Sequence, residues 1–205
     1  MTKTQIDRLG DRLRQGHVSE EDLRLLESYR RSFADAYDWV TQAIRAKLHI
    51  ETTGRAKTTD SITEQLRRES IRLPQIQDIA GCRVTVPNIR EQDSVVSLLQ
   101  QLFVGAEVVD RRKAPSHGYR AVHVIATVGG KLIEIQVRTA RQHQWAELSE
   151  KLSDVIDPAI KYGGGDDEDA EDALHNMVTL SRRRHVVDSV GTDLGKFPGT
   201  KRCTF

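Results

Sequence analysis

Residues 120–138 have the sequence RAVHVIATVGGKLIEIQVR, which predicts the centre of the fold. Apolar and polar residues alternate on both sides of Gly129-Gly130, with a period that is typical of half-buried strands. A glycine pair between two such runs favours a tight hairpin turn, so we predict paired strands at 120–128 and 132–137. Successive side chains of the second strand face opposite sides of the sheet. One side carries Ile133, Ile135 and Val137, and the other carries Glu134, Gln136 and Arg138.

Two more strands are predicted before this hairpin. From Ile76 the period is again two, and apolar Cys82 and Val84 alternate with polar neighbours until Pro87 ends the strand. Residues 106–110 form a shorter candidate strand. Both segments are short enough to belong to one sheet with the hairpin.

Apolar residues spaced by threes and fours predict helices around these strands. A short helix at 2–15 ends at Gly16, and a capping box at 19–22 starts one long helix that continues to about residue 49. Ser61 is expected to cap the next helix, which Pro74 ends. Further helices are expected at 95–103, at 140–155 and before the arginine triplet at 182–184.

This order of elements predicts an α/β (α+β) domain, with one mixed, mostly antiparallel sheet flanked by helices. We expect N-terminal helices packed on the core at 1–50 and the core itself at 51–160. An acidic linker and a helix should follow at 161–188, and a loosely ordered tail at 189–205. Six of the seven residues at 166–172 are acidic, which is typical of a solvated loop or helix start.

The composition excludes several classes of protein. The 205 residues include 31 Lys and Arg against 30 Asp and Glu, which argues against a globally basic nucleic-acid binder. Two cysteines cannot form a disulfide framework or a four-cysteine zinc site. No apolar run reaches the roughly 18 residues of a membrane span. The charged N-terminus lacks the apolar core of a signal peptide, so we expect a cytoplasmic protein without membrane contact.

The polar residues around the predicted strands indicate phosphate chemistry. Asp78 lies at the start of the first strand and Glu134 on the polar face of the last. Arg55 and Lys57 lie two apart in a polar connection before a helix start, where basic groups can bind phosphate. Two carboxylates that hold Mg²⁺, together with basic residues that neutralise the transferring group, are what phosphoryl-type transfer requires.

Five segments, in this order, resemble motifs of the RelA/SpoT synthetase domain, whose members are ATP-dependent pyrophosphokinases that make alarmone nucleotides. They are Arg55-x-Lys57-x-x-x-Ser61-Ile62, Asp78-Ile-x-Gly81-x-Arg83, Gly118-Tyr119-Arg120-x-x-His123, Glu134-Ile-Gln136-Val-Arg138-Thr139 and Trp145-Ala-Glu147. The resemblance implies a nucleotidyltransferase-like sheet flanked by helices. It also implies transfer of the β,γ-pyrophosphate of ATP to a ribose 3′-hydroxyl.

The resemblance assigns a role to each matching residue. Asp78 and Glu134 correspond to the Mg²⁺ carboxylates, with Glu134 also a general base for the acceptor hydroxyl. The expected ATP-binding residues are Arg55, Lys57, Ser61 and Arg83. Tyr119 corresponds to the ring that stacks on the acceptor base. The other expected acceptor-binding or scaffold residues are His123, Gln136, Arg138 and His143.

The chain departs from the family pattern at three positions. Gln65 stands where the family often has Lys, and Ser116 follows Pro115 where Lys is usual. His143 stands where small alarmone synthetases have an Asn that contacts the guanine edge. Because the last two lie in the acceptor half of the site, the resemblance supports pyrophosphate transfer better than it supports a guanine nucleotide as acceptor.

Three functions therefore remain open. The first is a small alarmone synthetase acting on ATP and a guanine nucleotide. The second is a toxin-like relative that modifies the 3′ end of tRNA, with basic clusters at 111–113 and 182–184 for the tRNA backbone and a neutralising antitoxin as partner. The third is a non-catalytic nucleotide sensor. A homo-oligomer is possible with any of them.

Overall fold

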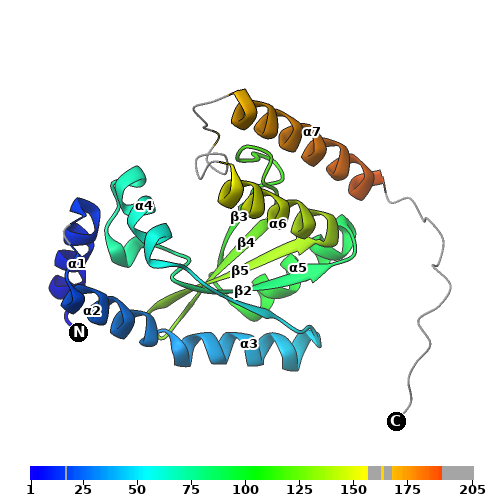
Figure 1. Ribbon diagram of the computed structural model, residues 1–205. Coiled ribbons are helices and arrows are strands. Elements are labelled where there is room, and N and C mark those ends of the chain that lie inside the picture. Colours follow the sequence, from blue (N-terminus) through cyan, green and yellow to red (C-terminus); the bar gives the residue numbers. More distant parts are fainter. Residues whose placement is uncertain (17, 157–162, 164–167, 191–205) are drawn as a thin grey trace, which may run out of the picture.

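A five-stranded sheet forms the centre of the computed structural model, which describes residues 1–16, 18–156, 163 and 168–190 (Figure 1). The strands are β1 (Thr53–Ala56), β2 (Ala80–Val86), β3 (Glu107–Asp110), β4 (Val122–Val128) and β5 (Lys131–Thr139). Their order is β1-β2-β5-β4-β3, and among these pairs only β2 and β5 run parallel. The predicted mixed, mostly antiparallel sheet flanked by helices is confirmed.

The hairpin of β4 and β5 forms where the sequence predicts it. Gly129 and Gly130 have φ angles of 55° and 73°, which the two-residue turn between Val128 and Lys131 requires. Strand β4 begins at Val122, two residues later than expected, because residues 116–119 form a turn of their own. In that turn Tyr119 N donates to Ser116 O over 2.8 Å, and Gly118 has φ +93°.

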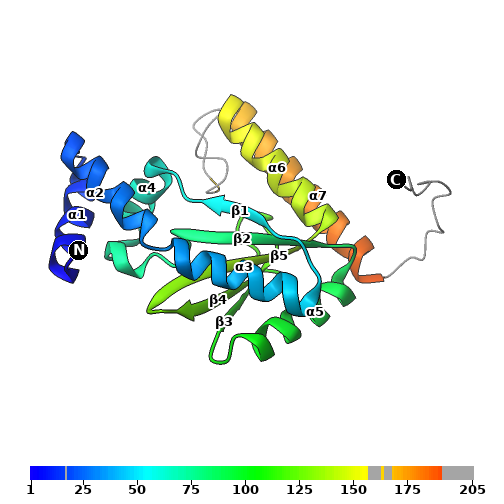
Figure 2. The same cartoon turned by 90° about the horizontal axis from the view of Figure 1, so that it is seen from below.

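The two faces of the sheet differ in chemistry. Helices α3 (Ala34–Leu48) and α5 (Ile89–Leu102) cover the apolar face, as Figure 2 shows from below. Helix α6 (Ala140–Val155) lies on the polar face, and α7 (Glu168–Val190) packs on α6. The sheet residues buried in the main core are Cys82, Val84, Val86, Val122, Val124, Ala126, Ile133, Ile135 and Val137. The polar face is therefore left for the site.

The remaining helices gather at the β1 end of the sheet. Helix α1 (Lys3–Gln15) ends at Gly16 in a left-handed conformation, as predicted, and packs on α4 (Thr59–Glu69) and the short 3₁₀ helix η1 (Leu73–Gln75). Helix α2 (Glu20–Arg31) begins at the predicted capping box, where Asp22 N donates to the Ser19 hydroxyl. Arg14 of α1 donates to the Leu66 carbonyl over 2.9 Å, and Arg30 of α2 donates to the Lys57 carbonyl over 2.6 Å, so both helices are tied to α4 or to the chain just before it.

The prediction of a single long helix up to residue 49 is wrong, because a turn at residues 32–33 interrupts the helix between α2 and α3. The Ser32 hydroxyl donates to the Tyr29 carbonyl over 2.6 Å, and Phe33 N turns to Arg30 O at 3.0 Å, a spacing of three residues instead of four. Both break residues keep helical backbone angles, so the apolar stripe runs on through buried Tyr29 and Phe33. Leu23, expected in that stripe, is 42% exposed.

Three boundaries near the site also differ from the predictions. Residues 53–56, expected as a polar connection, form the edge strand β1. Helix α4 is capped by Thr58 instead of Ser61, since the Thr58 hydroxyl accepts from Ser61 N. Strand β2 begins at Ala80, because Gln77 and Asp78 form a turn before it.

Two expectations fall partly outside the described residues. They are the tail at 189–205, of which 191–205 are not described, and the acidic run at 166–172, whose last five residues begin α7. In the described part of the chain, no helix combines the length and apolar character needed to cross a bilayer.

Candidate active site

The register of the sheet places the predicted functional residues side by side on its polar face. Arg55 of β1 lies opposite Gly81 of β2, and Gly81 lies opposite Glu134 of β5. A Cβ atom at position 81 would lie 2.6 Å from the Glu134 carbonyl oxygen and 3.3 Å from its Cβ. Glycine at this position lets the two parallel strands approach, and it leaves the space beside the Glu134 side chain open.

A guanidinium joins the two predicted metal carboxylates. Arg55 Nη1 lies 2.9 Å from Asp78 Oδ2 and 3.1 Å from Glu134 Oε2. Lys57 Nζ lies 2.8 Å from the same Asp78 oxygen. The side chains of Asp78 and Glu134 are only 14% and 8% exposed, so these ion pairs are poorly screened by solvent. Arg55 of the edge strand β1 and Lys57, which directly follows that strand, thus neutralise both acids.

Five side chains of the hairpin and the turn before it form a closed ring of hydrogen bonds. Glu134 Oε1 accepts from His123 Nδ1 at 2.7 Å, and Glu134 Oε2 accepts from Gln136 Nε2 at 2.6 Å. Arg138 Nη2 donates to Gln136 Oε1 at 2.8 Å and to the Tyr119 hydroxyl at 2.9 Å. The Tyr119 hydroxyl lies 2.9 Å from His123 Nε2 and closes the ring. Since Arg138 only donates, the Tyr119 proton is free for His123.

This ring and Arg55 set the charge of Glu134. Burial raises the pKa of Glu134, but the hydrogen bond from His123, the charge of Arg55 and the Gln136 hydrogen bond together lower that pKa to about 2. Burial alone would lower the pKa of Arg55, yet Glu134 and Asp78 raise it on balance. Burial raises the pKa of Tyr119, which stays a hydroxyl. The centre of the site is therefore an ionised carboxylate held by fixed donors.

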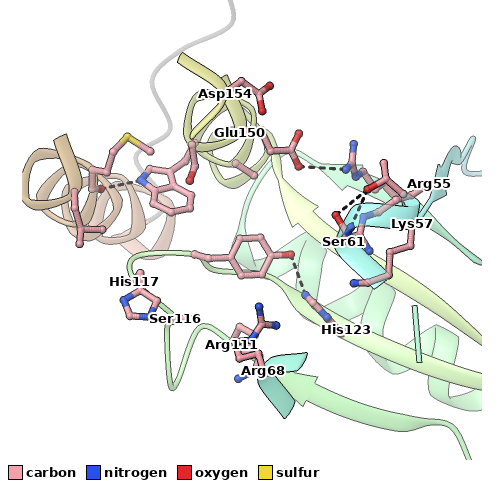
Figure 3. A pocket seen from close by; sticks show the side chains of 18 of the residues that line it. Arg55, Lys57, Ser61, Arg68, Arg111, Ser116, His117, His123, Glu150 and Asp154 are labelled. Carbon is pink, nitrogen blue, oxygen red and sulfur yellow. Dashed lines mark hydrogen bonds and ion pairs between the residues drawn. The ribbon is translucent and has the colours of Figure 1, made fainter. Parts of the chain in front are cut away.

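A pocket of about 740 Å³ opens over this polar face (Figure 3). Its volume is typical of a site for a nucleotide-sized ligand. In the view of Figure 3, Arg55, Lys57 and Ser61 lie on one side of the pocket, and Ser116 and His117 lie on the other. Asp78 and Glu134 do not line it, because Arg55, Lys57 and His123 lie between these carboxylates and the open space.

The far wall of the pocket is apolar and comes from α6 and α7. Trp145 and Ala146 of α6 and Leu174 and Met177 of α7 line the pocket. Trp145 Nε1 donates to the Met177 carbonyl at 2.8 Å. Together with Tyr119, these helices form a second, small hydrophobic cluster separate from the main core. The pocket is thus cationic at one end and apolar at the other.

The structure brings most, but not all, of the predicted site residues to this pocket. Arg83 lines it, 3.6 Å from Glu150 of α6, and burial and the nearby Arg138 lower the pKa of Arg83. Gln136 and Arg138 are buried behind the pocket wall. His143 does not line the pocket, and its Nε2 lies 3.4 Å from Glu147 Oε1 on the same helix.

Other pocket residues were not predicted. Trp145 belongs to the last motif quoted from the sequence, but that motif carried no assigned role. Leu174 and Met177 had no signal, because an apolar residue on a helix normally indicates core packing. Arg68 and Arg111 also line the pocket from α4 and from the loop after β3.

The arrangement fits a magnesium ion that arrives with a nucleotide. Among the described residues no group of three or more His, Cys, Asp or Glu side chains could hold a metal alone. Mg²⁺ is commonly held by one or two carboxylates plus substrate phosphates, and Asp78 and Glu134 provide such a pair. No third protein ligand is needed.

Residues 54–153, which include β2 to β5 and most of β1 and α6, match the family described as "Region found in RelA / SpoT proteins". Residues 54–153 belong to the RelA/SpoT family. The chain is 38% identical over 115 residues to an uncharacterised protein of Mycobacterium tuberculosis, covering 54% of this chain and 42% of that protein.

A GTP pyrophosphokinase of Bacillus subtilis is 35% identical over 129 residues, covering 55% of this chain and 57% of that enzyme. The chain thus spans about half the length of the curated relatives it matches. Structural similarity covers more of the chain than these sequence matches do. The crystal structure of small alarmone synthetase 1 from Bacillus subtilis superposes with a TM-score of 0.58 and 26% identity, over 84% of this chain and 96% of that chain. The same synthetase bound to its product pppGpp gives 0.61 at 24% identity, over 82% and 96%.

Proposed function

We propose that this RelA/SpoT domain is a pyrophosphokinase that transfers the β,γ-pyrophosphate of ATP to the ribose 3′-hydroxyl of a guanine nucleotide. The observation that carries the proposal is the carboxylate pair Asp78 and Glu134, joined by Arg55 beneath a pocket rich in cations. Metal-holding carboxylates and mobile cations are the parts that such a transfer needs. Similarity to a GTP pyrophosphokinase supports this choice of reaction.

The donor half of the site would bind the ATP phosphates. Mg²⁺ held by Asp78 and Glu134 would neutralise phosphate charge there. Arg55 and Lys57 already lie in ion pairs with these carboxylates, and they can exchange the carboxylate oxygens for phosphate oxygens. Arg83 has one carboxylate within 4 Å in the described chain, Glu150 at 3.6 Å, so it is largely available for a phosphate. Ser61 adds a hydroxyl at the start of α4.

The acceptor half would orient the ribose hydroxyl. The Tyr119 ring borders the pocket with its hydroxyl fixed by Arg138, which suits it to stack on a base. With a pKa of about 2, Glu134 is ionised and takes up a proton poorly. When Arg55 moves to a phosphate, the charge of Mg²⁺ would replace that of Arg55, so Glu134 would stay ionised. An ionised Glu134 can accept a hydrogen bond from the acceptor hydroxyl and orient it.

The test is a transfer assay with purified protein and γ-labelled ATP. With GDP or GTP present we expect label in the guanine nucleotide and release of AMP, because a simple kinase would release ADP instead. Asp78→Asn should abolish transfer while its circular dichroism spectrum stays unchanged. Label that leaves as inorganic phosphate, or that stays in ATP with every guanine nucleotide, would overturn the proposal. Full transfer by Asp78→Asn would overturn the metal assignment.

A second acceptor, the 3′ end of tRNA, is favoured by the exposed Arg111 at the pocket. The neighbouring Arg112 does not add to such a surface, because Asp110 and Asp93 hold it at 2.9 and 2.7 Å. A parallel reaction with deacylated tRNA separates the two. Label in tRNA alone would support the toxin-like function and a neutralising antitoxin. Nucleotide binding without transfer would support the sensor. Gel filtration of the same sample would show whether it is a homo-oligomer.

A further inference from the structure

Helix α7 lies beyond the residues that match the RelA/SpoT family, yet it forms part of the pocket. The matched region ends at residue 153, and α7 spans Glu168–Val190. Leu174 and Met177 line the pocket from this helix, and Met177 is only 4% exposed. Any role of α7 at the site is therefore additional to the motifs that identify the family.

Helix α7 is fixed against the site by specific polar contacts. The carboxylate of Asp188, whose side chain is 0% exposed, accepts from the Thr139 hydroxyl and pairs with Arg141, both at 2.6 Å. At the pocket end, the Met177 carbonyl accepts from Trp145 Nε1, and the Ser181 hydroxyl donates to the Gly118 carbonyl. Buried charge-assisted bonds of this kind set the register of a helix strongly.

The same helix presses on the turn that carries Tyr119. A Cβ atom at Gly118 would lie 2.9 Å from Trp145 Cζ2, 3.2 Å from Val178 Cα and 3.3 Å from Ser181 Cβ. Only glycine allows the turn to approach the backbone of α7 this closely while φ is +93°. Tyr119 is thus held at its hydroxyl by Arg138 and His123 and at its backbone by α7.

The pocket beside Tyr119 is suited to a flat, apolar-faced group. The rings of Tyr119 and Trp145 lie 6.5 Å apart at an interplanar angle of 54°, and Met177 belongs to the same cluster. The cations that could bind phosphate, Arg55 and Lys57, come from β1 and the loop that follows it. A nucleobase with a phosphorylated ribose matches this division between an apolar end and a cationic end.

We propose that α7 completes the acceptor half of the pocket, with Met177 as a contact for the nucleobase and Asp188 as a positioning residue that fixes the helix. This inference rests on the proposed function, because it concerns the acceptor of that reaction. It predicts that α7 governs affinity for the base-bearing acceptor and leaves ATP binding nearly unchanged.

Two substitutions in α7 test separately the nucleobase contact of Met177 and the positioning role of Asp188. Met177→Ala should raise KM for GDP about tenfold, which corresponds to the loss of one apolar side-chain contact, and leave KM for ATP unchanged. Met177→Leu keeps the volume and should restore the KM for GDP. Asp188→Asn removes the charge that Arg141 pairs with, and it should raise KM for GDP in the same selective way. Val186→Ala, at a site 59% exposed on the same helix, is the matched control.

A binding measurement keeps the inference separate from catalysis. The chain has two tryptophans, and Trp39 lies on α3 across the sheet, so Trp39→Phe leaves Trp145 as the only reporter. GDP should quench Trp145 without ATP present, and Met177→Ala should weaken that quenching about tenfold. Calorimetric titration with pyrophosphate, which has no base, should give the same affinity in both proteins.

The outcomes are distinct. If Met177→Ala changes neither the KM for GDP nor the affinity for GDP, or raises the KM values for ATP and for GDP equally, the inference is overturned. If the unchanged chain transfers no label to any acceptor, the proposed function is overturned, and the Trp145 titration still decides the role of α7. A red-shifted Trp145 emission in Asp188→Asn, without a change in GDP affinity, would reduce Asp188 to a structural residue and overturn its positioning role.

Discussion

The charge of Glu134 should make the stability of the fold depend on pH in a defined window. Its pKa falls from 4.5 to about 2 on folding. One pKa unit corresponds to about 1.4 kcal/mol, so the ionised carboxylate contributes roughly 3 kcal/mol to the free energy of unfolding. Because the folded pKa is the lower one, this contribution is fully present above pH 4.5 and is lost as the pH falls toward 2.

Glu134→Gln isolates this contribution. The glutamine keeps a similar shape but does not titrate, so the stability of the variant should lack this part of the acid dependence. Between pH 6 and pH 3, the free energy of unfolding from urea denaturation should fall by about 2 kcal/mol more in the native chain than in Glu134→Gln. The reason is that pH 3 lies about 1.5 units below the unfolded-state pKa, and each pH unit there corresponds to about 1.4 kcal/mol. Glu150→Gln, at a side chain 58% exposed, is the control and should follow the native chain.

The reasoning would be refuted by equal losses in the native chain and Glu134→Gln. Such a result would mean that the hydrogen bonds of Glu134 and its pairing with Arg55 are replaced by equivalent interactions in the unfolded chain. A loss that occurs entirely above pH 5 would also contradict it, because the folded-state pKa would then be raised instead of lowered.

Two further predictions concern neighbouring residues of β2. Gly81→Ala should lower the free energy of unfolding by about 1–3 kcal/mol, as over-packing does, because its Cβ would lie 2.6 Å from the Glu134 carbonyl oxygen. Urea denaturation measures this loss of stability, and an unchanged midpoint with full transfer activity would show that β2 and β5 separate freely. Cys82 is buried, and its pKa is raised to about 12. In a Cys203→Ser background, no thiol should therefore react with an aromatic disulfide reagent until urea unfolds the chain, and rapid labelling of the folded protein at pH 8 would contradict this burial.

The parts of the fold that could be predicted are those with a strong local cause. The alternating residues on both sides of Gly129-Gly130 specify the hairpin, because only glycine adopts both positive φ angles without strain. The break at Ser32 could not be predicted, since both helices continue one apolar stripe across it. Strand β1 was missed because its four residues, Thr53–Ala56, show no alternation of apolar and polar side chains and lie at the edge of the sheet.

The candidate site divides in the same way. Arg55, Asp78 and Glu134 could be proposed from residue type and order, and the register of three strands brings them together. The contacts of Met177 and Leu174 could not, because they depend on how α7 docks against α6 and on the turn before β4. That docking is a tertiary effect, and apolar residues on a helix give no indication of which surface they will meet.

The closed ring has a consequence for the order of folding. All five of its residues lie between 119 and 138, in the β4–β5 hairpin and the turn before it, so they meet through short loops. Arg55 reaches Glu134 only across 79 positions of chain, and Asp78 joins them through Arg55, with β2 paired parallel to β5. Contacts of high sequence separation form late, because closing a long loop lowers the entropy of the chain before the new contacts stabilise it. The ring should therefore assemble first, and a nascent chain should gain its two-carboxylate centre only when the hairpin has captured β2.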